Sequence, residues 1–409
     1  MGRHHRTAQS RELAGSSQQP SPRSWVSDVV RGGMCFLAGA GVATLVAILI
    51  GLASDERSSA AANVVTANAA TRTGRRGAGL GDWMRFSDAE MAQVDIARLN
   101  LSAAEGLPGA EGLDVDATIA ELDRWATHVA SETERNIHRF RENPGEYDNS
   151  ESYFRALMLI VVLQGDLGVH YNQSRIGEPD FTNSKDLFLH GMVGDANGGT
   201  CVSMPVLYVA IGRRLGYPMK LALTKGHVFA RWDGADHPNP ALRGRFNVEG
   251  TNRGLSTPDD QHYAEWPNKL TDTERANDWF LRSLTPAEEL AVFLMQRGHC
   301  LEDTGRTAEA QAAYAIAHQF APKSPEALAY LIKVVRAEAI ARASSDPKAV
   351  AVNAKRDSSA QWTAEGRRQA TEIARQAIER GRIQPTTAPS SPRPPPGGPI
   401  APQIPGMPK

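Results

Sequence analysis

Residues 198–250 constrain the fold more than any other stretch, because a helical pattern there leads directly into two strand patterns. Between Val202 and Leu215 the apolar side chains recur at helical spacing, and Gly216 follows where a C-terminal helix cap is expected. The segment 228–232 is rich in β-branched and aromatic residues, and 244–250 carries a second strand pattern after a polar loop. The sequence therefore predicts a helix followed by an antiparallel hairpin.

A cysteine stands at the start of the predicted helix. The unpaired N–H groups and the positive dipole end of a helix N-terminus favour a thiolate, which is the nucleophilic form of cysteine. Pro205 suits the first helical position, so regular helix is expected to begin near Met204. Cys201 would then lie in the turn that leads into the helix.

A histidine begins the first predicted strand, where it could serve as a base. Antiparallel pairing brings His227 opposite Glu249 or its neighbour. Asn247 and Glu249 share one face of the second strand, so either could accept a ring N–H of His227. A lone cysteine or histidine is more often structural, but here a nucleophile, a base and an orienting group each fall at an element boundary.

The order Cys201, His227, Glu249, with the cysteine on a Gly-Thr-Cys helix start, resembles the transglutaminase-like superfamily, whose core is similar to papain-like cysteine proteases. That family usually has Asp at the third position, in a Val-Asp-Pro-Thr-type strand end, where this chain has Glu249. The resemblance covers roughly residues 85–275. It implies an α+β fold with helices packed on a small antiparallel sheet, and catalysis by a cysteine nucleophile.

The remaining chain divides by composition. The length of 409 residues allows one large or two modest domains, and a net charge of −1 without a basic stripe predicts no nucleic-acid partner. The expected segments are a disordered basic tail (1–31), a transmembrane helix (32–54), a flexible linker (55–84), the transglutaminase-like domain (85–275), tetratricopeptide-like helices (276–345), a linker with a helix (346–383) and a Pro-rich disordered tail (384–409).

Residues 32–54 carry no charge and match the about 20 residues needed to cross a bilayer. The basic flank before them would stay cytoplasmic by the positive-inside rule, which places the main domain outside the cell or in the periplasm. A cleaved signal peptide is the alternative, with small residues at 59–62 as a cleavage site. The long polar leader favours a single-pass membrane anchor.

Helix caps mark the domain's first helices. Ser87 and Glu90 form a capping box that predicts a helix through about Arg98, and further helices are expected at 114–140 and 150–163.

The C-terminal part is Ala-rich and helical. The segment 291–324 matches one tetratricopeptide repeat, and 325–343 would form the next helix; the matching residues are Gly298, Gly305, Ala310, Tyr314, Ala317 and Pro322. A single repeat cannot bury its own face, so it should dock on the catalytic domain or on a protein partner bound through residues 285–343. Bacterial transglutaminase-like proteins of one subgroup carry such helices.

The irregular region before Cys201 should supply an oxyanion-hole donor. Gln164, Gln173, Asn183 and Asn197 are candidates, and the backbone N–H of Cys201 is an equally good one. No cofactor is expected. No metal is expected either, because His227, His237 and His262 lack metal-ligand spacing. Three cysteines do not form a disulfide scaffold, which leaves a free thiol as a functional hint.

Together these features predict a membrane-anchored cysteine enzyme that acts on amide bonds of a protein or peptide substrate. Cys201 would form a thioester that water resolves (peptidase or amidase) or an amine resolves (acyl transfer). The alternative is a non-catalytic envelope adaptor that uses the same fold and the C-terminal helices to hold a protein partner.

Overall fold

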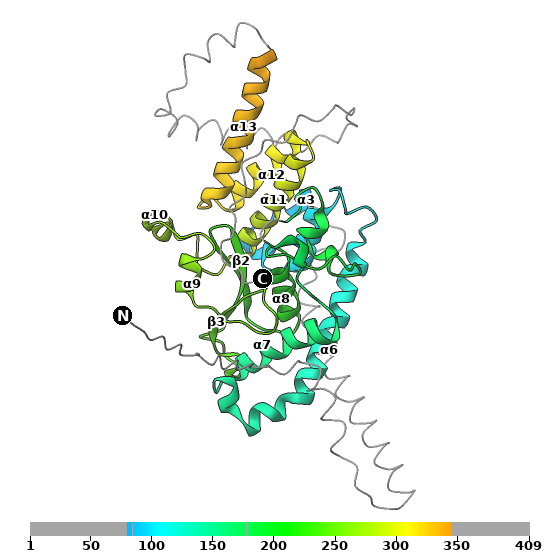
Figure 1. Cartoon of the computed structure of the whole chain (residues 1–409), viewed down its shortest axis with the longest axis vertical. Helices are drawn as coiled ribbons and strands as arrows, with labels where there is room; N and C mark the ends of the chain where they lie inside the picture. The colour runs from blue at the N-terminus through cyan, green and yellow to red at the C-terminus, as the bar shows by residue number, and fades with distance from the viewer. Residues whose placement is uncertain (1–79, 84, 177–178, 346–409) are drawn as a thin grey trace, which may run out of the picture. The chain divides into compact units, whose positions relative to one another are not determined.

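A computed structural model describes residues 80–83, 85–176 and 179–345, all within the compact unit 56–409 (Figure 1). The predicted segments 1–31, 32–54, 346–383 and 384–409 lie outside the described residues, as does most of the predicted linker. Among the helices that are described, none is both long and apolar enough to cross a membrane.

The described residues form an α+β fold with eleven α-helices and one small antiparallel sheet, which confirms the predicted fold class. The helices are α3 (Leu80–Trp83), α4 (Asp88–Met91), α5 (Ile96–Ala104), α6 (Val115–Glu142), α7 (Glu151–Val161), α8 (Met204–Arg214), α9 (Asp260–Glu265), α10 (Asp272–Ala276), α11 (Pro286–Asp303), α12 (Thr307–Phe320) and α13 (Pro325–Ser345).

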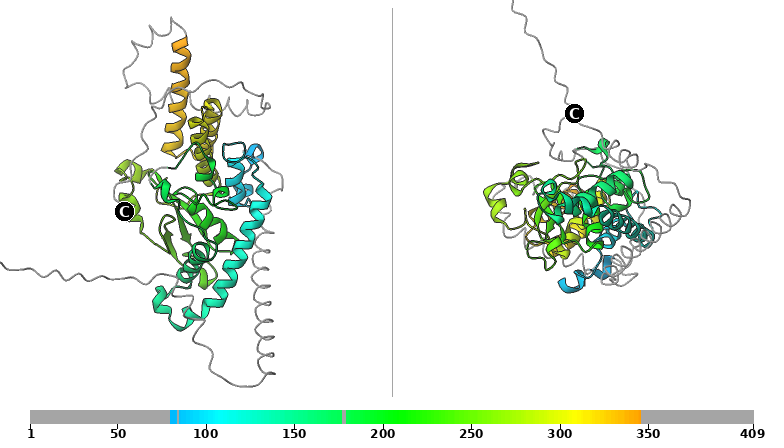
Figure 2. Two further views of the ribbon diagram at one scale, coloured as in Figure 1. Left: turned by 45° about the vertical axis from the view of Figure 1, so that its right-hand side comes forward. Right: turned by 90° about the horizontal axis from the view of Figure 1, so that it is seen from below.

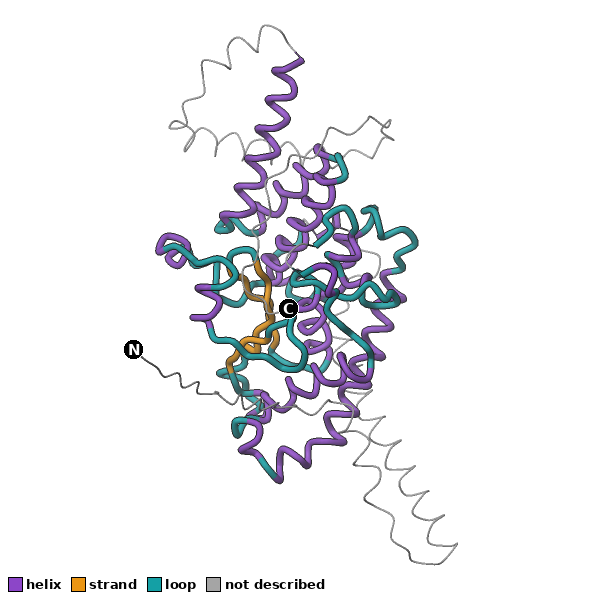
Figure 3. The backbone as a smooth tube through the Cα atoms, in the orientation of Figure 1, coloured by secondary structure: helices purple, strands orange, loops and turns teal. Residues whose placement is uncertain are grey.

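The sheet has the order β1-β2-β3 and is antiparallel throughout (Figure 3). Its strands are β1 (Met219–Thr224), β2 (His227–Asp233) and β3 (Arg245–Val248). Ala230 pairs with Val248, so continuing this register would place Phe229, not His227, opposite Glu249. The predicted hairpin of β2 and β3 is confirmed. His227 comes two residues before Phe229 in β2 and lies on the same face of the strand. The long side chain of Glu249 must therefore reach it diagonally.

Helix α8 lies at the centre of the core. It contacts β1 and β2 of the sheet, and helices α5, α6 and α7 also pack against it (Figure 2). A Cβ on Gly212 would lie 2.3 Å from Sδ of Met219, so the helix approaches β1 very closely. Arg214 is buried and forms ion pairs of 2.6 Å to Asp95 and 2.8 Å to Asp123. These contacts fix the helix that follows Cys201.

Local caps define the first helices, with one difference from the sequence prediction. Ser87 and Glu90 form the predicted capping box, but the helix does not continue to Arg98. The helix ends at Met91, and Asp95 caps a new helix by accepting the N–H of Ala97 at 2.8 Å. The described residues begin at position 80, inside the predicted linker, and Trp83 on α3 is already buried there.

The C-terminal helices α11, α12 and α13 pack next to one another in chain order (Figure 1). Gly298 allows the close contact, because a Cβ there would lie 2.3 Å from the ring of Tyr314. Helix α11 docks on the rest of the unit: buried Glu289 accepts two hydrogen bonds from Arg213, at 2.9 and 2.6 Å. Residues 281–284 pair with the outer edge of β1 through two backbone hydrogen bonds of 2.8 Å.

Candidate active site

Cys201 lies in a turn directly before α8, and the helix begins at Met204 as Pro205 predicts. The turn is closed by the N–H of Met204, which donates to the carbonyl of Thr200 at 3.0 Å, and by the N–H of Thr200, which donates to Oγ of Ser203 at 2.9 Å. Cys201 is a free cysteine and is only partly buried. The residue is therefore held at a fixed place with part of its surface open to solvent.

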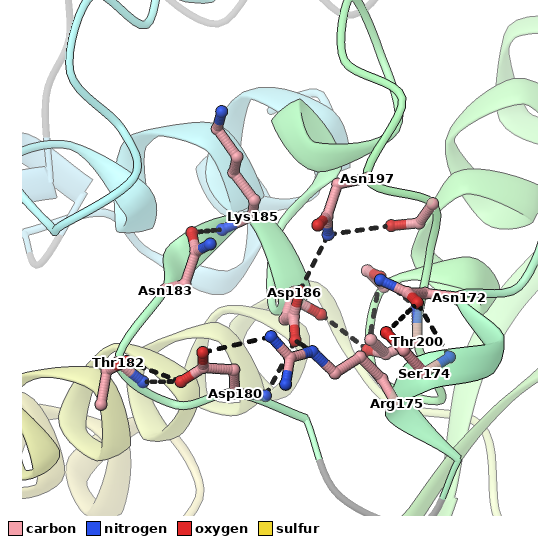
Figure 4. Close-up of polar contacts among 12 residues, drawn as sticks. Asn172, Ser174, Arg175, Asp180, Thr182, Asn183, Lys185, Asp186, Asn197 and Thr200 are labelled. Carbon is pink, nitrogen blue, oxygen red and sulfur yellow. Dashed lines mark hydrogen bonds and ion pairs between the residues drawn. The ribbon is translucent and has the colours of Figure 1, made fainter.

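A buried carboxylate braces the chain that leads to Cys201 (Figure 4). Asp186 is fully buried and accepts hydrogen bonds of 2.8 Å from the side chain of Asn197 and the N–H of Asp180. Arg175 forms an ion pair with the Asp186 carboxylate at 2.8 Å, and the backbone carbonyl of Asp186 accepts the hydroxyl of Thr200 at 2.6 Å. This network fixes Thr200, the residue before the cysteine.

His227 is buried, with an exposed fraction of 3%. Its Nε2 lies 2.9 Å from Oε2 of Glu249. Trp266 contacts the ring edge-on at 4.9 Å between ring centroids, and Tyr263 lies nearly parallel to it at 6.0 Å. Two aromatic side chains from the segment after the hairpin thus pack on the imidazole.

Glu249 is buried and fully hydrogen-bonded. Besides His227, its Oε2 accepts the hydroxyl of Tyr263 at 2.7 Å, and its Oε1 accepts the N–H and the hydroxyl of Thr251, each at 2.9 Å. A carboxylate held by this many donors is fixed in place and stabilised in its charged form.

The other possible orienting residue, Asn247, lies elsewhere. Its Oδ1 accepts Nε of Arg231 at 2.7 Å, and its Nδ2 donates to Asp260 and to the carbonyl of Pro258, each at 2.9 Å. Arg231 is fully buried and also pairs with Asp260. Of the two residues that the sequence left open, the structure brings Glu249 to the histidine.

His227 and Glu249 are coupled by charge. Burial by itself lowers the pKa of His227, but the charge of Glu249 and hydrogen bonding with Cys201 and Glu249 outweigh burial and raise it. For Glu249 burial raises the pKa, and the charge and hydrogen bonds of His227 and Tyr263 outweigh it and lower the pKa. The pair therefore favours an imidazolium next to a carboxylate.

Cys201 lies close enough to the imidazole to affect its protonation. Both hydrogen bonding and charge at Cys201 contribute to the raised pKa of His227. Nδ1 nevertheless has no partner of standard hydrogen-bond geometry among the described residues, so the contact between thiol and imidazole is loose in this state. Hydrogen bonds that are long or poorly aligned are common in ligand-free sites and tighten when substrate binds.

Tyr171 is a site residue that the sequence did not reveal. The N–H of Asn172 donates to the carbonyl of Gly199 at 2.8 Å, and the N–H of Gly199 donates to the carbonyl of His170 at 2.9 Å, so Tyr171 runs beside the approach to Cys201. Burial and the charge of Cys201 raise the pKa of the phenol, while a hydrogen bond from the N–H of Cys201 lowers it. A lone tyrosine in an irregular loop carries no sequence signal for this contact.

Of the four side chains suggested for an oxyanion hole, three have other hydrogen-bond partners and one is exposed. Gln164 donates to the hydroxyl of Tyr208 at 3.0 Å and to the carbonyl of Asn252 at 3.1 Å, so both its amide hydrogens are engaged. Asn197 donates to Asp186. Asn183 accepts the N–H of Lys185 at 3.0 Å as a helix cap, and Gln173 is exposed.

The fold and the site together define an α+β protein with a cysteine, a buried histidine and a buried glutamate in one cluster. Across the described ranges, no three His, Cys, Asp or Glu side chains are placed to hold a metal ion. No model of a protein family matches the chain, and no significant match was found among curated proteins or solved structures.

Proposed function

We propose that this chain is a transglutaminase-like cysteine enzyme, with a papain-like order of nucleophile, base and orienting group, that acts on amide bonds of a protein or peptide. One observation carries the proposal: Cys201, a free and only partly buried cysteine, lies within electrostatic and hydrogen-bonding range of a buried ion pair of His227 and Glu249. Such coupling of a nucleophile, a base and an orienting group is the arrangement that covalent catalysis needs.

In the proposed reaction the Cys201 thiolate attacks the carbonyl carbon of the amide. The proton on Nδ1 of His227 passes to the leaving nitrogen, the C–N bond breaks, and a thioester remains on the sulfur. Water or a primary amine then gives a proton to His227 and attacks the thioester, which releases the thiolate. Glu249 holds the Nε2–H throughout and so keeps the ring oriented.

The negative oxygen of the intermediate needs donors near the sulfur. The backbone N–H of Cys201 is one donor, and in this state it points to the Tyr171 hydroxyl. The phenolic O–H of Tyr171 donates to the carbonyl of Arg175 at a long 3.5 Å, so it can turn to an oxyanion that binds beside this N–H. Tyr171 is therefore proposed as the second donor of the oxyanion hole.

A purely adaptor function fits this cluster less well. A buried ion pair pays a desolvation penalty that well-packed apolar residues would avoid. An adaptor has no use for a charged imidazole beside a partly exposed thiol. The membrane anchor at 32–54, a main domain outside the cell or in the periplasm, and tetratricopeptide-like packing of α11–α13 complete the proposal.

Acylation of Cys201 tests the function without knowledge of the natural substrate. With p-nitrophenyl acetate, the full-length chain should release a burst of about one nitrophenolate per chain, because the thiolate takes the acetyl group as a thioester faster than water removes it. Peptide mapping in acid should locate the acetyl group on Cys201. Cys300→Ala should leave the burst intact, whereas Cys201→Ala should abolish it; a burst in Cys201→Ala, or none in the wild type, contradicts the proposal.

Tyr171→Phe separates oxyanion stabilisation from thiol reactivity. Loss of one donor should slow acetylation by p-nitrophenyl acetate by about 10²-fold, since removal of an oxyanion donor has effects of that order. Alkylation by iodoacetamide forms no oxyanion, so its rate should stay within about twofold of wild type. Stopped-flow acetylation and timed alkylation measure the two rates. Equal slowing of both reactions would show that Tyr171 acts on the thiol and not on the oxyanion.

A further inference from the structure

The turn between β1 and β2 is held by side chains from outside the sheet. It consists of Lys225 and Gly226, and His227 follows immediately. Lys225 forms an ion pair of 2.8 Å with Glu274 on α10, and its carbonyl accepts the side chain of Asn268 at 3.2 Å. Gly226 has a positive φ of 78°, which suits glycine at this turn.

A further contact with the turn comes from the C-terminal helices. Glu326, in the first turn of α13, accepts the backbone N–H of Gly226. It also accepts Nε1 of Trp279 at 3.3 Å, and Trp279 is fully buried. Burial raises the pKa of Glu326 to about 7, although both hydrogen bonds oppose that rise. A first-turn glutamate more often serves its own helix, whereas this one is used to hold a turn of the sheet.

Imidazole placement depends on this turn. The ring end of His227 is fixed by Glu249 and by contacts with Tyr263 and Trp266. Its backbone end is fixed by pairing with Thr224 and by the neighbouring Gly226. Because Nδ1 only loosely contacts Cys201, a small movement of the turn would separate the two groups.

We propose that Glu326 is a positioning residue for His227: by holding the N–H of Gly226, it sets the distance between the imidazole and Cys201. Helix α13 thus becomes part of the catalytic device and is more than an appended repeat. This inference rests on the proposed function, because it concerns the same thiol and imidazole. Glu326 touches neither substrate nor the reacting atoms, so it acts only through the turn.

The test compares three variants of the full chain by the rate of Cys201 alkylation with iodoacetamide at pH 6. Glu326→Ala should slow alkylation about 10-fold, since a displacement of about 1 Å can cost up to ~10²-fold in an aligned site. Glu326→Gln keeps an acceptor for the N–H of Gly226, so it should restore the rate to within about threefold of wild type. Glu326→Asp is one methylene shorter and should fall between them, which gives a second variant if alanine prevents folding.

Leu331→Ala is the matched control for a merely structural effect. Leu331 is fully buried on the same helix, five residues beyond Glu326. Its truncation should lower the melting temperature at least as much as Glu326→Ala, yet leave the alkylation rate near wild type. Equal slowing in both variants, or wild-type alkylation in Glu326→Ala, overturns the inference.

His227→Ala distinguishes this inference from the proposed function. If His227→Ala slows alkylation while Glu326→Ala does not, the function stands and only the positioning role fails. If His227→Ala alkylates as fast as wild type, the proposed function fails, and the positioning role fails with it.

Discussion

His227→Ala should slow acetylation of Cys201 by p-nitrophenyl acetate by about 10⁴-fold, because it removes both the proton carrier and the positive charge that favours the thiolate. Alkylation by iodoacetamide at pH 6 needs no proton from His227, so it reports only the loss of the positive charge beside the thiol. An ordinary thiol is only about 0.3% thiolate at pH 6, and a stabilised thiolate is a weaker nucleophile, so the expected slowing is between about 10- and 100-fold. Mass spectrometry of the alkylated peptides measures the rate at Cys201.

Two controls accompany this variant. Cys300 is buried, and burial raises the pKa of its thiol to about 11, so it should stay unlabelled in wild type and mutant. His262→Ala removes an exposed imidazole that packs on Tyr263 and Trp266 without touching the thiol. It should alkylate like wild type. Identical labelling of Cys201 in wild type, His227→Ala and His262→Ala would exclude the thiolate–imidazolium pair without contradicting the fold.

Glu249→Ala should lower the free energy of unfolding by about 3–5 kcal/mol near pH 6, because removing one partner leaves a buried charge without compensation. Glu249→Gln is the matched control: it can still accept the ring N–H, but its amide must face donors at Thr251 or Tyr263, so part of the loss should remain. Denaturant unfolding at several pH values measures both. A loss under about 1 kcal/mol for Glu249→Ala would contradict the buried pair.

The pH dependence of that loss follows from the two pKa shifts. The pKa of Glu249 is lowered, so its contribution is present above about pH 4.3 and disappears as pH falls through the folded-state pKa. The pKa of His227 is raised, so its contribution is present below about pH 6.5 and disappears as pH rises through the folded-state pKa. The difference between wild type and Glu249→Ala should therefore be largest between about pH 4.5 and 6.5. A difference that is constant from pH 3 to 9 would mean that the pair is not ionised.

Short-range features of the site could be read from the sequence. Pro205 has a fixed φ that suits the first helical turn, and this places Cys201 in the turn before α8. Capping side chains at Asp114 and Ser150 bond to backbone groups three residues away, so they mark where α6 and α7 begin. These interactions involve neighbours in the chain and need no knowledge of the fold.

Residues distant in sequence decided the rest. Asn247 and Glu249 share one strand face, and the sequence could not choose between them. Arg231 and Asp260 engage Asn247, whereas Tyr263 and Thr251 complete the hydrogen bonds of Glu249 beside His227. A one-dimensional pattern does not record which buried polar group receives which partner.

The sequence by itself thus determined the helix start just after Cys201 and the hairpin that carries His227, because backbone dihedrals, caps and alternation are local. The tertiary structure decided the contact of Tyr171 with the N–H of Cys201 and of Glu326 with Gly226. The first contact joins residues 30 positions apart in the chain, and the second joins residues 100 positions apart. Such pairs form only when packing buries both partners together, since a buried polar group must find a hydrogen bond wherever the fold provides one.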